Sequence, residues 1–117
     1  MGAGKIIDRV TGHFDAVGLR QIEVPEWGDE AGPLIIYAEP MTLAEKTAVN
    51  KAVEASGKGA HALFVEVLVL KARDEHGEPM FDKGDKPVLR TRADAAVVER
   101  IALKIMAAAT VEDQEKN

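Results

Sequence analysis

Cysteine is absent from the 117 residues of the chain, so disulfide bonds and thiolate chemistry are both excluded. Long apolar runs are absent as well. The longest, residues 62–70, is broken by Glu66 and is far shorter than the roughly 20 residues that a membrane span requires. The first residues contain no apolar segment of the kind found in signal peptides. We therefore expect a cytoplasmic protein with no membrane partner.

Positive charge is scarce. Lys and Arg number 15 against 20 Asp and Glu, which gives a formal net charge of −5. Binding to nucleic-acid phosphates requires clustered Lys and Arg, so we do not expect a nucleic-acid partner. Hydrophobic residues make up 46% of the chain, which is enough to bury a core in one domain of this length without metals or disulfides.

Motifs of catalysis and metal binding are also missing. The histidines His13, His61 and His76 are not at ligand spacing, and no metalloprotease motif occurs. The acidic residues of segment 74–78 have no apolar surroundings that would separate their pKa values into an acid and a base. We predict no catalytic residue, no metal ligand and no cofactor, and therefore a protein that is not an enzyme.

The hydrophobic pattern of residues 19–40 predicts a β-hairpin. Residues 19–24 end in strict alternation, with Ile22 and Val24 on one face, which is typical of a half-exposed strand. We expect Pro25 to end this strand, because proline cannot donate to a ladder. Residues 26–33 are expected to form a long loop, and residues 34–38 the second strand. Such a long connection predicts a loose register.

The region 42–109 is predicted to be helical. Thr42 and Glu45 form a capping box, and the helix should end at Ser56 before Gly57. Residues 61–73 are apolar on nearly all sides, which predicts a central buried helix. Two polar turns, 74–81 and 82–86, should precede a last helix over 93–109 that is capped from Thr91 to Asp94.

These elements predict an α+β fold in a single domain, 1–117: a small N-terminal β-hairpin followed by a bundle of about three helices. Residues 1–18 are ambiguous, because their apolar residues have helical spacing but Gly12 and Gly18 disfavour a helix. Residues 110–117 are predicted to form a disordered acidic tail.

Aromatic residues are few, at 4% of the chain, and the only tryptophan lies in the turn-like stretch VPEWG. Trp and Tyr are favoured anchors of protein interfaces, and an exposed strand edge can accept a strand from another copy. The candidate surface for a partner or for self-association is Trp27, Leu34, Ile36 and Tyr37, with Met80 and Phe81 second. The same residues could instead belong to the core, and the sequence leaves this alternative open.

Three stretches together resemble the tail assembly chaperones of long-tailed bacteriophages and related prophage elements. They are IEVPEWG followed by LIIYAEPMT, the capped helix TLAEKTAVNKAV, and an apolar helix that leads to DEHGEPMF and then to a last helix with an acidic tail. The resemblance covers the chain from about Gln21 to its end. The segment DKGDKPVLR departs from the family pattern, in which an acidic run leads directly into the last helix.

The resemblance implies a non-catalytic protein of the bacterial host cytoplasm. Such proteins bind the long helical tape measure protein, keep it soluble, help to recruit tail tube subunits, and are missing from the finished particle. Some members self-associate, which implies a homo-oligomer. The alternatives are a structural tail or head–tail completion protein that stays in the particle, a small regulatory protein-binding module, and an enzyme of unrecognised type that uses the acids of residues 74–78.

Overall fold

The computed structural model describes residues 5–59 and 61–107, and within them the fold is α+β, as predicted. A two-stranded antiparallel hairpin is followed by helices, but the described residues contain five α-helices, not about three. The elements are α1 (Ile6–Val17), β1 (Arg20–Asp29), β2 (Gly32–Ala38), α2 (Leu43–Ser56), α3 (His61–Lys71), the 3-10 turn η2 (Lys83–Asp85), α4 (Lys86–Thr91) and α5 (Ala95–Met106).

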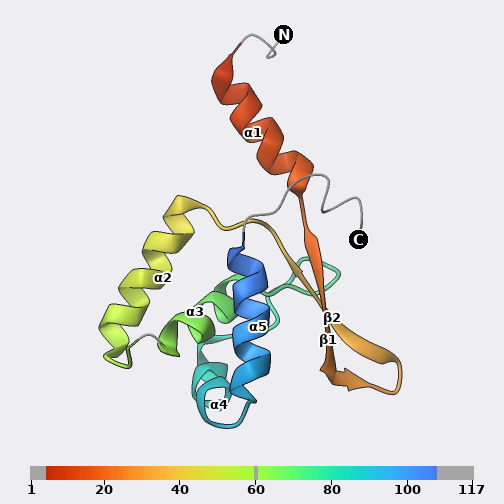
Figure 1. Cartoon of the computed structure of the whole chain (residues 1–117), viewed down its shortest axis with the longest axis vertical. Coiled ribbons are helices and arrows are strands. Elements are labelled where there is room, and N and C mark those ends of the chain that lie inside the picture. The colour runs from red at the N-terminus through yellow and green to blue at the C-terminus, as the bar shows by residue number, and fades with distance from the viewer. Residues whose placement is uncertain (1–4, 60, 108–117) are drawn as a thin grey trace.

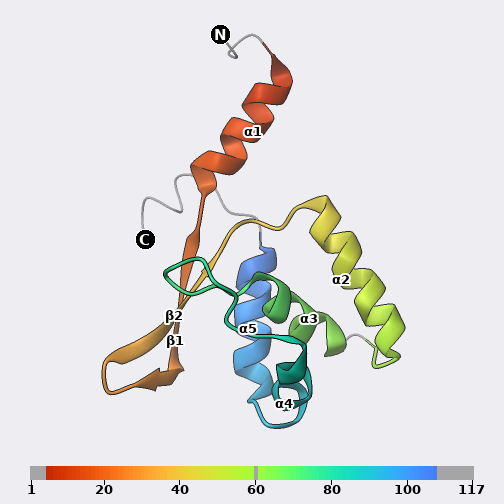
Figure 2. The same ribbon diagram turned by 180° about the vertical axis from the view of Figure 1, so that it is seen from behind.

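Helices α2, α4 and α5 are arranged around α3, and the hairpin lies beside α5 (Figures 1 and 2). α3 packs against α2, α4 and α5, and α5 also contacts β1. α1 extends away from the rest of the molecule in both views. The ambiguous first segment of the sequence is helical from Ile6 to Val17, although Gly12 lies within it.

The core lies where α3 and α5 meet the inner face of the hairpin. Val67 and Leu68 of α3 and Ile101 of α5 are fully buried there. The expectation of a central buried helix over residues 61–73 is thus confirmed, with the helix ending at Lys71. Lys71 is the one buried charged residue among those described, and its ammonium lies 2.8 Å from a carboxylate oxygen of Glu45.

The prediction that Pro25 ends the first strand is wrong. β1 continues through Pro25 to Asp29 and pairs there with Gly32, so that only two residues connect the strands. Val24 pairs with Leu34, and alternation turns the backbone nitrogen of the next residue away from β2. A proline at this position removes no ladder hydrogen bond, which is why it is tolerated on an edge strand.

The stretch PEWG forms a large bulge in β1. Its four residues lie between the paired residues Val24 and Asp29, whereas Pro33 alone lies between their partners on β2. Glycine is required at position 28, where the backbones of the two strands approach most closely. A Cβ added there would collide with the Gly32 carbonyl oxygen and would lie 2.8 Å from the Pro33 Cα. The bulge bends β1 and re-aims Trp27, a common use of such irregularities.

The capping box of α2 is confirmed. The Thr42 hydroxyl accepts from the Glu45 amide at 3.1 Å, and the Glu45 carboxylate accepts from the Thr42 amide at 3.0 Å. Gly57 ends the helix in the left-handed conformation. The apolar stripe of α2 is only partly used for packing, because Val49 is buried but Leu43 is 83% exposed.

The boundaries of the last helices differ from prediction. The polar turn after residue 81 is the η2 turn, and a short helix, α4, follows it at once. Thr91 is the last residue of α4, where its hydroxyl donates to the Pro87 carbonyl, so it does not cap the next helix. Asp94 is the N-cap of α5, which spans Ala95–Met106 rather than 93–109. The predicted acidic tail lies outside the described residues.

Candidate functional site

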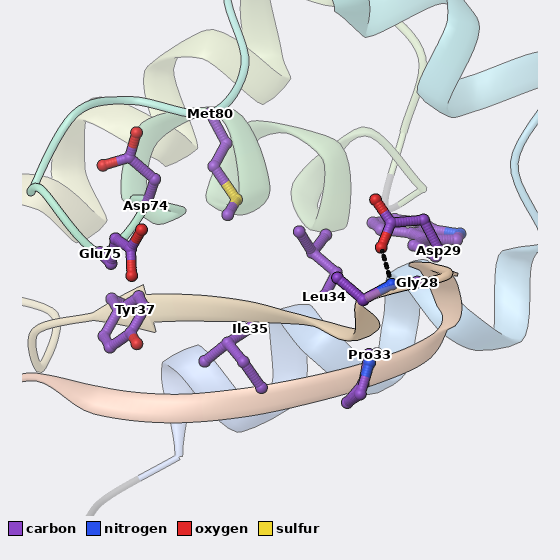
Figure 3. A pocket seen from close by; sticks show the side chains of 12 residues that line it. Gly28, Asp29, Pro33, Leu34, Ile35, Tyr37, Asp74, Glu75 and Met80 are labelled. Carbon is purple, nitrogen blue, oxygen red and sulfur yellow. Dashed lines mark hydrogen bonds between the residues drawn. The ribbon is translucent and has the colours of Figure 1, made fainter.

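Four of the six candidate residues line one groove beside the hairpin. Trp27, Leu34, Tyr37 and Met80 border a depression of about 420 Å³ between β2, the hairpin end and the connector of residues 74–80. Figure 3 shows Met80, Asp74 and Glu75 on the side of β2 that faces away from β1. Residues predicted from separate segments are therefore brought together by the fold.

Phe81, the fifth candidate, does not line the groove but contacts Trp27, which does. Its ring meets the Trp27 ring edge to face, with centroids 6.4 Å apart and an interplanar angle of 77°. Both side chains are partly buried and pack against the core. Trp27 is thus neither a pure core residue nor a freely exposed anchor: one part is fixed by Phe81 and the core, and another part forms the groove wall.

Ile36, the sixth candidate, does not lie on the surface. It is fully buried and belongs to the core. Successive residues of a strand point to opposite faces, so Ile36 and Tyr37 cannot share a face. The groove is instead lined by Ile35, a residue that the sequence reasoning missed. Ile35 lies two residues before Tyr37 and shares its face of β2, a spacing that could have identified it, whereas Leu34 lies on the face of Ile36 and still lines the groove at its edge.

Arg73, the residue before the connector, pairs with Tyr37 of β2. The Tyr37 amide donates to the Arg73 carbonyl at 2.9 Å, and the Arg73 amide donates to the Tyr37 carbonyl at the same distance. Arg73 also forms an isolated bridge with Pro79. These pairings hold the connector, which carries Asp74, Glu75 and Met80, against β2.

The charged lining of the groove is entirely acidic. Asp29, Asp74 and Glu75 contribute to it, whereas Lys, Arg and His are absent from the lining residues that the structure describes. The Asp74 carboxylate accepts hydrogen bonds from the amides of Glu78 and His76, which lower the pKa of Asp74. Asp74 therefore stays ionised and fixes the turn, and the groove as a whole favours apolar and cationic groups.

No protein-family model, curated protein or solved structure matches the chain. Within residues 5–59 and 61–107, no cluster of three or more His, Cys, Asp and Glu side chains could hold a metal ion. None of the helices in that part of the chain is long and apolar enough to cross a membrane. Function is therefore inferred from the groove, the exposed surfaces and the sequence.

A second exposed apolar surface lies on α1. Ile6, Ile7 and Val10 are each more than half exposed, and Val17 is the only residue of this helix that is buried. These residues repeat at helical spacing, so they form one face that nothing in the described chain covers. The sequence showed this spacing, but the two glycines kept the segment from being assigned.

An ion pair ties the bulge of β1 to α5. Both nitrogens of the Arg100 guanidinium fork donate to the Glu26 carboxylate, at 2.7 and 2.8 Å. The side-chain hydrogen bond from Arg100 lowers the pKa of Glu26 from an ordinary value of 4.5 to about 2. Glu26 precedes Trp27, so this bidentate pair restrains the backbone that positions the tryptophan.

The pair predicts a specific loss of stability in acid. Because folding lowers the pKa of Glu26, the stabilisation is complete above pH 4.5 and is lost as the pH falls toward about 2. In the Glu26→Gln variant we expect the free energy of unfolding to decrease less steeply between pH 4.5 and about 2 than in the parent chain. Urea unfolding at a series of pH values measures it. Arg100→Gln should reduce the pH dependence of the unfolding free energy over the same range. If both variants kept the pH dependence of the parent chain, the Glu26–Arg100 pair would not be its source.

Proposed function

We propose that the chain is a non-catalytic tail assembly chaperone. It binds the tape measure protein in the cytoplasm of the bacterial host, keeps it soluble while a long phage tail is built, helps to recruit tail tube subunits, and is left out of the finished particle. The proposal joins the resemblance of the IEVPEWG, TLAEKTAVNKAV and DEHGEPMF stretches to the shape of the molecule.

The observation that carries the proposal is the groove beside the hairpin. Two of the three resembling stretches, VPEWG and DEHGEPMF, meet in it, since Trp27 comes from the first and Met80 from the second. An open groove with aromatic and aliphatic walls is suited to binding the apolar surface of a client protein. A chaperone for such a client requires this surface and requires no reactive group.

The exposed face of α1 supports a second part of the proposal, self-association. Three large apolar side chains on a helix that extends from the body would be unfavourable in an isolated monomer. Repetition of the groove in a homo-oligomer would also suit a long client, because several weak contacts combine into one strong attachment.

Co-expression with a tape measure protein from the genome that encodes this chain tests the proposal. We expect the client to be insoluble alone and soluble in a complex with the chain, as measured by size exclusion with light scattering. Tyr37→Ala, in the groove, should lower the yield of soluble client by about tenfold, as expected when an interface aromatic is truncated. The control Leu43→Ala removes a highly exposed leucine outside the groove and should change nothing.

Three outcomes would count against the proposal. A client that stays insoluble in the presence of the chain would exclude the chaperone role. Equal yields for Tyr37→Ala and Leu43→Ala would exclude the groove as the client surface. Abundance of the chain in purified particles, measured by mass spectrometry, would favour a structural tail or head–tail component instead.

A further inference from the structure

The edge of β2 that faces the groove has an unpaired position. The amide and carbonyl of Tyr37 point away from β1, toward Arg73. Strand alternation turns the amide and carbonyl of Ile35, two residues earlier, to the same edge. Among the described residues no backbone hydrogen bond reaches Ile35 from that side. Ile35 therefore offers one donor and one acceptor to the groove.

The connector leaves this position open because it turns away. The Asp74 amide donates to the Glu78 carbonyl, and the Gly77 amide donates to the Asp74 carbonyl, both within the turn. A strand that continued beyond Arg73 would have paired with Ile35. Instead, the chain turns at Asp74, so that its pairing with β2 is limited to the bridge between Arg73 and Tyr37. The groove occupies the space that such a strand would have filled, and Ile35 and Leu34 both line it.

The lining of the groove indicates which strand fits it. Asp29, Asp74 and Glu75 bring negative charge to the two sides of the Ile35 position, and within residues 5–59 and 61–107 no cation lines the groove to neutralise it. Trp27, Leu34 and Met80 provide apolar walls. A strand placed here gains from Lys or Arg side chains near the acids and from an apolar side chain against the tryptophan.

We propose that the groove binds an extended basic segment of a partner protein, which adds to β2 as a third strand opposite Ile35. The proposal rests on the proposed function for the role of the groove as binding surface, but not for the identity of the client. A second copy of the chain is disfavoured as the occupant, because its outer edge on β1 would bring Glu23 toward the acids of the groove.

Titration with synthetic peptides tests the proposal on the intact chain. The probe is a short capped peptide of alternating lysine and valine, and the matched control replaces lysine by glutamate. Trp27 is the only tryptophan and lines the groove, so its emission reports binding directly. We expect a saturable change with the basic peptide and at least about tenfold weaker binding of the acidic one. Equal binding of both, or no saturable change, would overturn the proposal.

Backbone methylation of the peptide separates strand addition from side-chain binding. In one version all lysine amides are methylated, and in the other all valine amides. Only one set of alternate amides faces β2, so one version should bind at least about tenfold more weakly and the other within about twofold of the parent. Equal weakening of the two versions would overturn strand addition.

Two further measurements place the peptide on the chain. Glu75→Lys should weaken binding about tenfold, whereas Glu54→Lys, the same charge change on the exposed face of α2, should weaken it about twofold or less. By NMR, the Ile35 amide should become protected from hydrogen exchange when the peptide is added. Protection that appears without peptide and grows with protein concentration would overturn the proposal in favour of a second copy.

Failure of this proposal and failure of the chaperone role give different results. If the tape measure protein becomes soluble with the chain but neither peptide binds, strand addition is wrong and the chaperone role stands. If the basic peptide binds in the expected register but the client stays insoluble, the groove is a strand-binding site and the chaperone role is wrong.

Discussion

Replacing Ile36 by alanine is expected to lower the free energy of unfolding by about 3 kcal/mol, because the side chain is fully buried between the hairpin and the helices. Ile35→Ala removes the same atoms one residue earlier, where the side chain is partly exposed and lines the groove, and should cost less than about 1 kcal/mol. Urea unfolding followed by Trp27 emission and by circular dichroism measures both values.

The two isoleucines form a matched pair that assigns the faces of β2. If both substitutions destabilised the fold equally, the alternation that places Ile36 inside and Ile35 in the groove would be wrong. If Ile35→Ala left stability unchanged but weakened binding of the basic peptide, Ile35 would contribute to binding in the groove and its neighbour Ile36 to the stability of the core. Ile36→Ala should affect binding only through loss of the folded state.

Local signals in the sequence predicted local structure well. The capping box at Thr42 and Glu45 involves only neighbouring residues, and it is present as expected. The apolar length of residues 61–71 was enough to identify a buried helix. α4 was missed because six residues that begin with Lys86 and Pro87 are too short to show a hydrophobic period.

The hairpin shows where local signals are insufficient. Whether Pro25 ends a strand depends on which edge its nitrogen faces, and that is decided by the pairing of β1 with β2. The prediction of a long loop failed for the same reason, since the four residues of the bulge stay within β1. Turn residues in a sequence indicate an interruption, but a bulge and a loop interrupt a strand with the same residue types.

The candidate site was predicted by residue type rather than by geometry. Trp27 and Met80 were proposed separately, and only the return of the connector to β2 at Arg73 places them in one groove. The acidic residues at positions 74 and 75 were assigned to a polar turn, and they also form a charged wall of that groove. Long-range pairing of this kind leaves no periodic signal in one sequence.

The buried contact between Lys71 and Glu45 leads to the second large effect. The Lys71 side chain is only 6% exposed, and its ammonium contacts the Glu45 carboxylate at 2.8 Å and the Pro40 carbonyl at 3.4 Å. Burial acts to raise the pKa of Glu45, but the hydrogen bonds from Lys71 and from the Thr42 amide together lower it. One carboxylate thus caps α2 and neutralises a buried charge of α3.

Glu45→Ala is therefore expected to destabilise the protein by about 3 kcal/mol, because it leaves the Lys71 ammonium buried without a negatively charged partner and also removes the capping box. Lys71→Met should cost less than about 1 kcal/mol, since methionine fills the same space and the remaining Glu45 carboxylate keeps its contact with the Thr42 amide and with water. Thermal and urea unfolding of the two variants measure this asymmetry.

The double variant, Glu45→Ala in the Lys71→Met background, separates the effect of the buried Lys71 charge from the loss of the capping contact of Glu45. In the Lys71→Met background no buried ammonium remains, so Glu45→Ala should cost only the capping contribution of about 1 kcal/mol. The difference between this value and the cost in the parent chain is the coupling energy of the pair, which we expect to be about 2 kcal/mol. Equal costs in the two backgrounds would mean that Glu45 acts only as a cap and that Lys71 finds its charge compensation elsewhere.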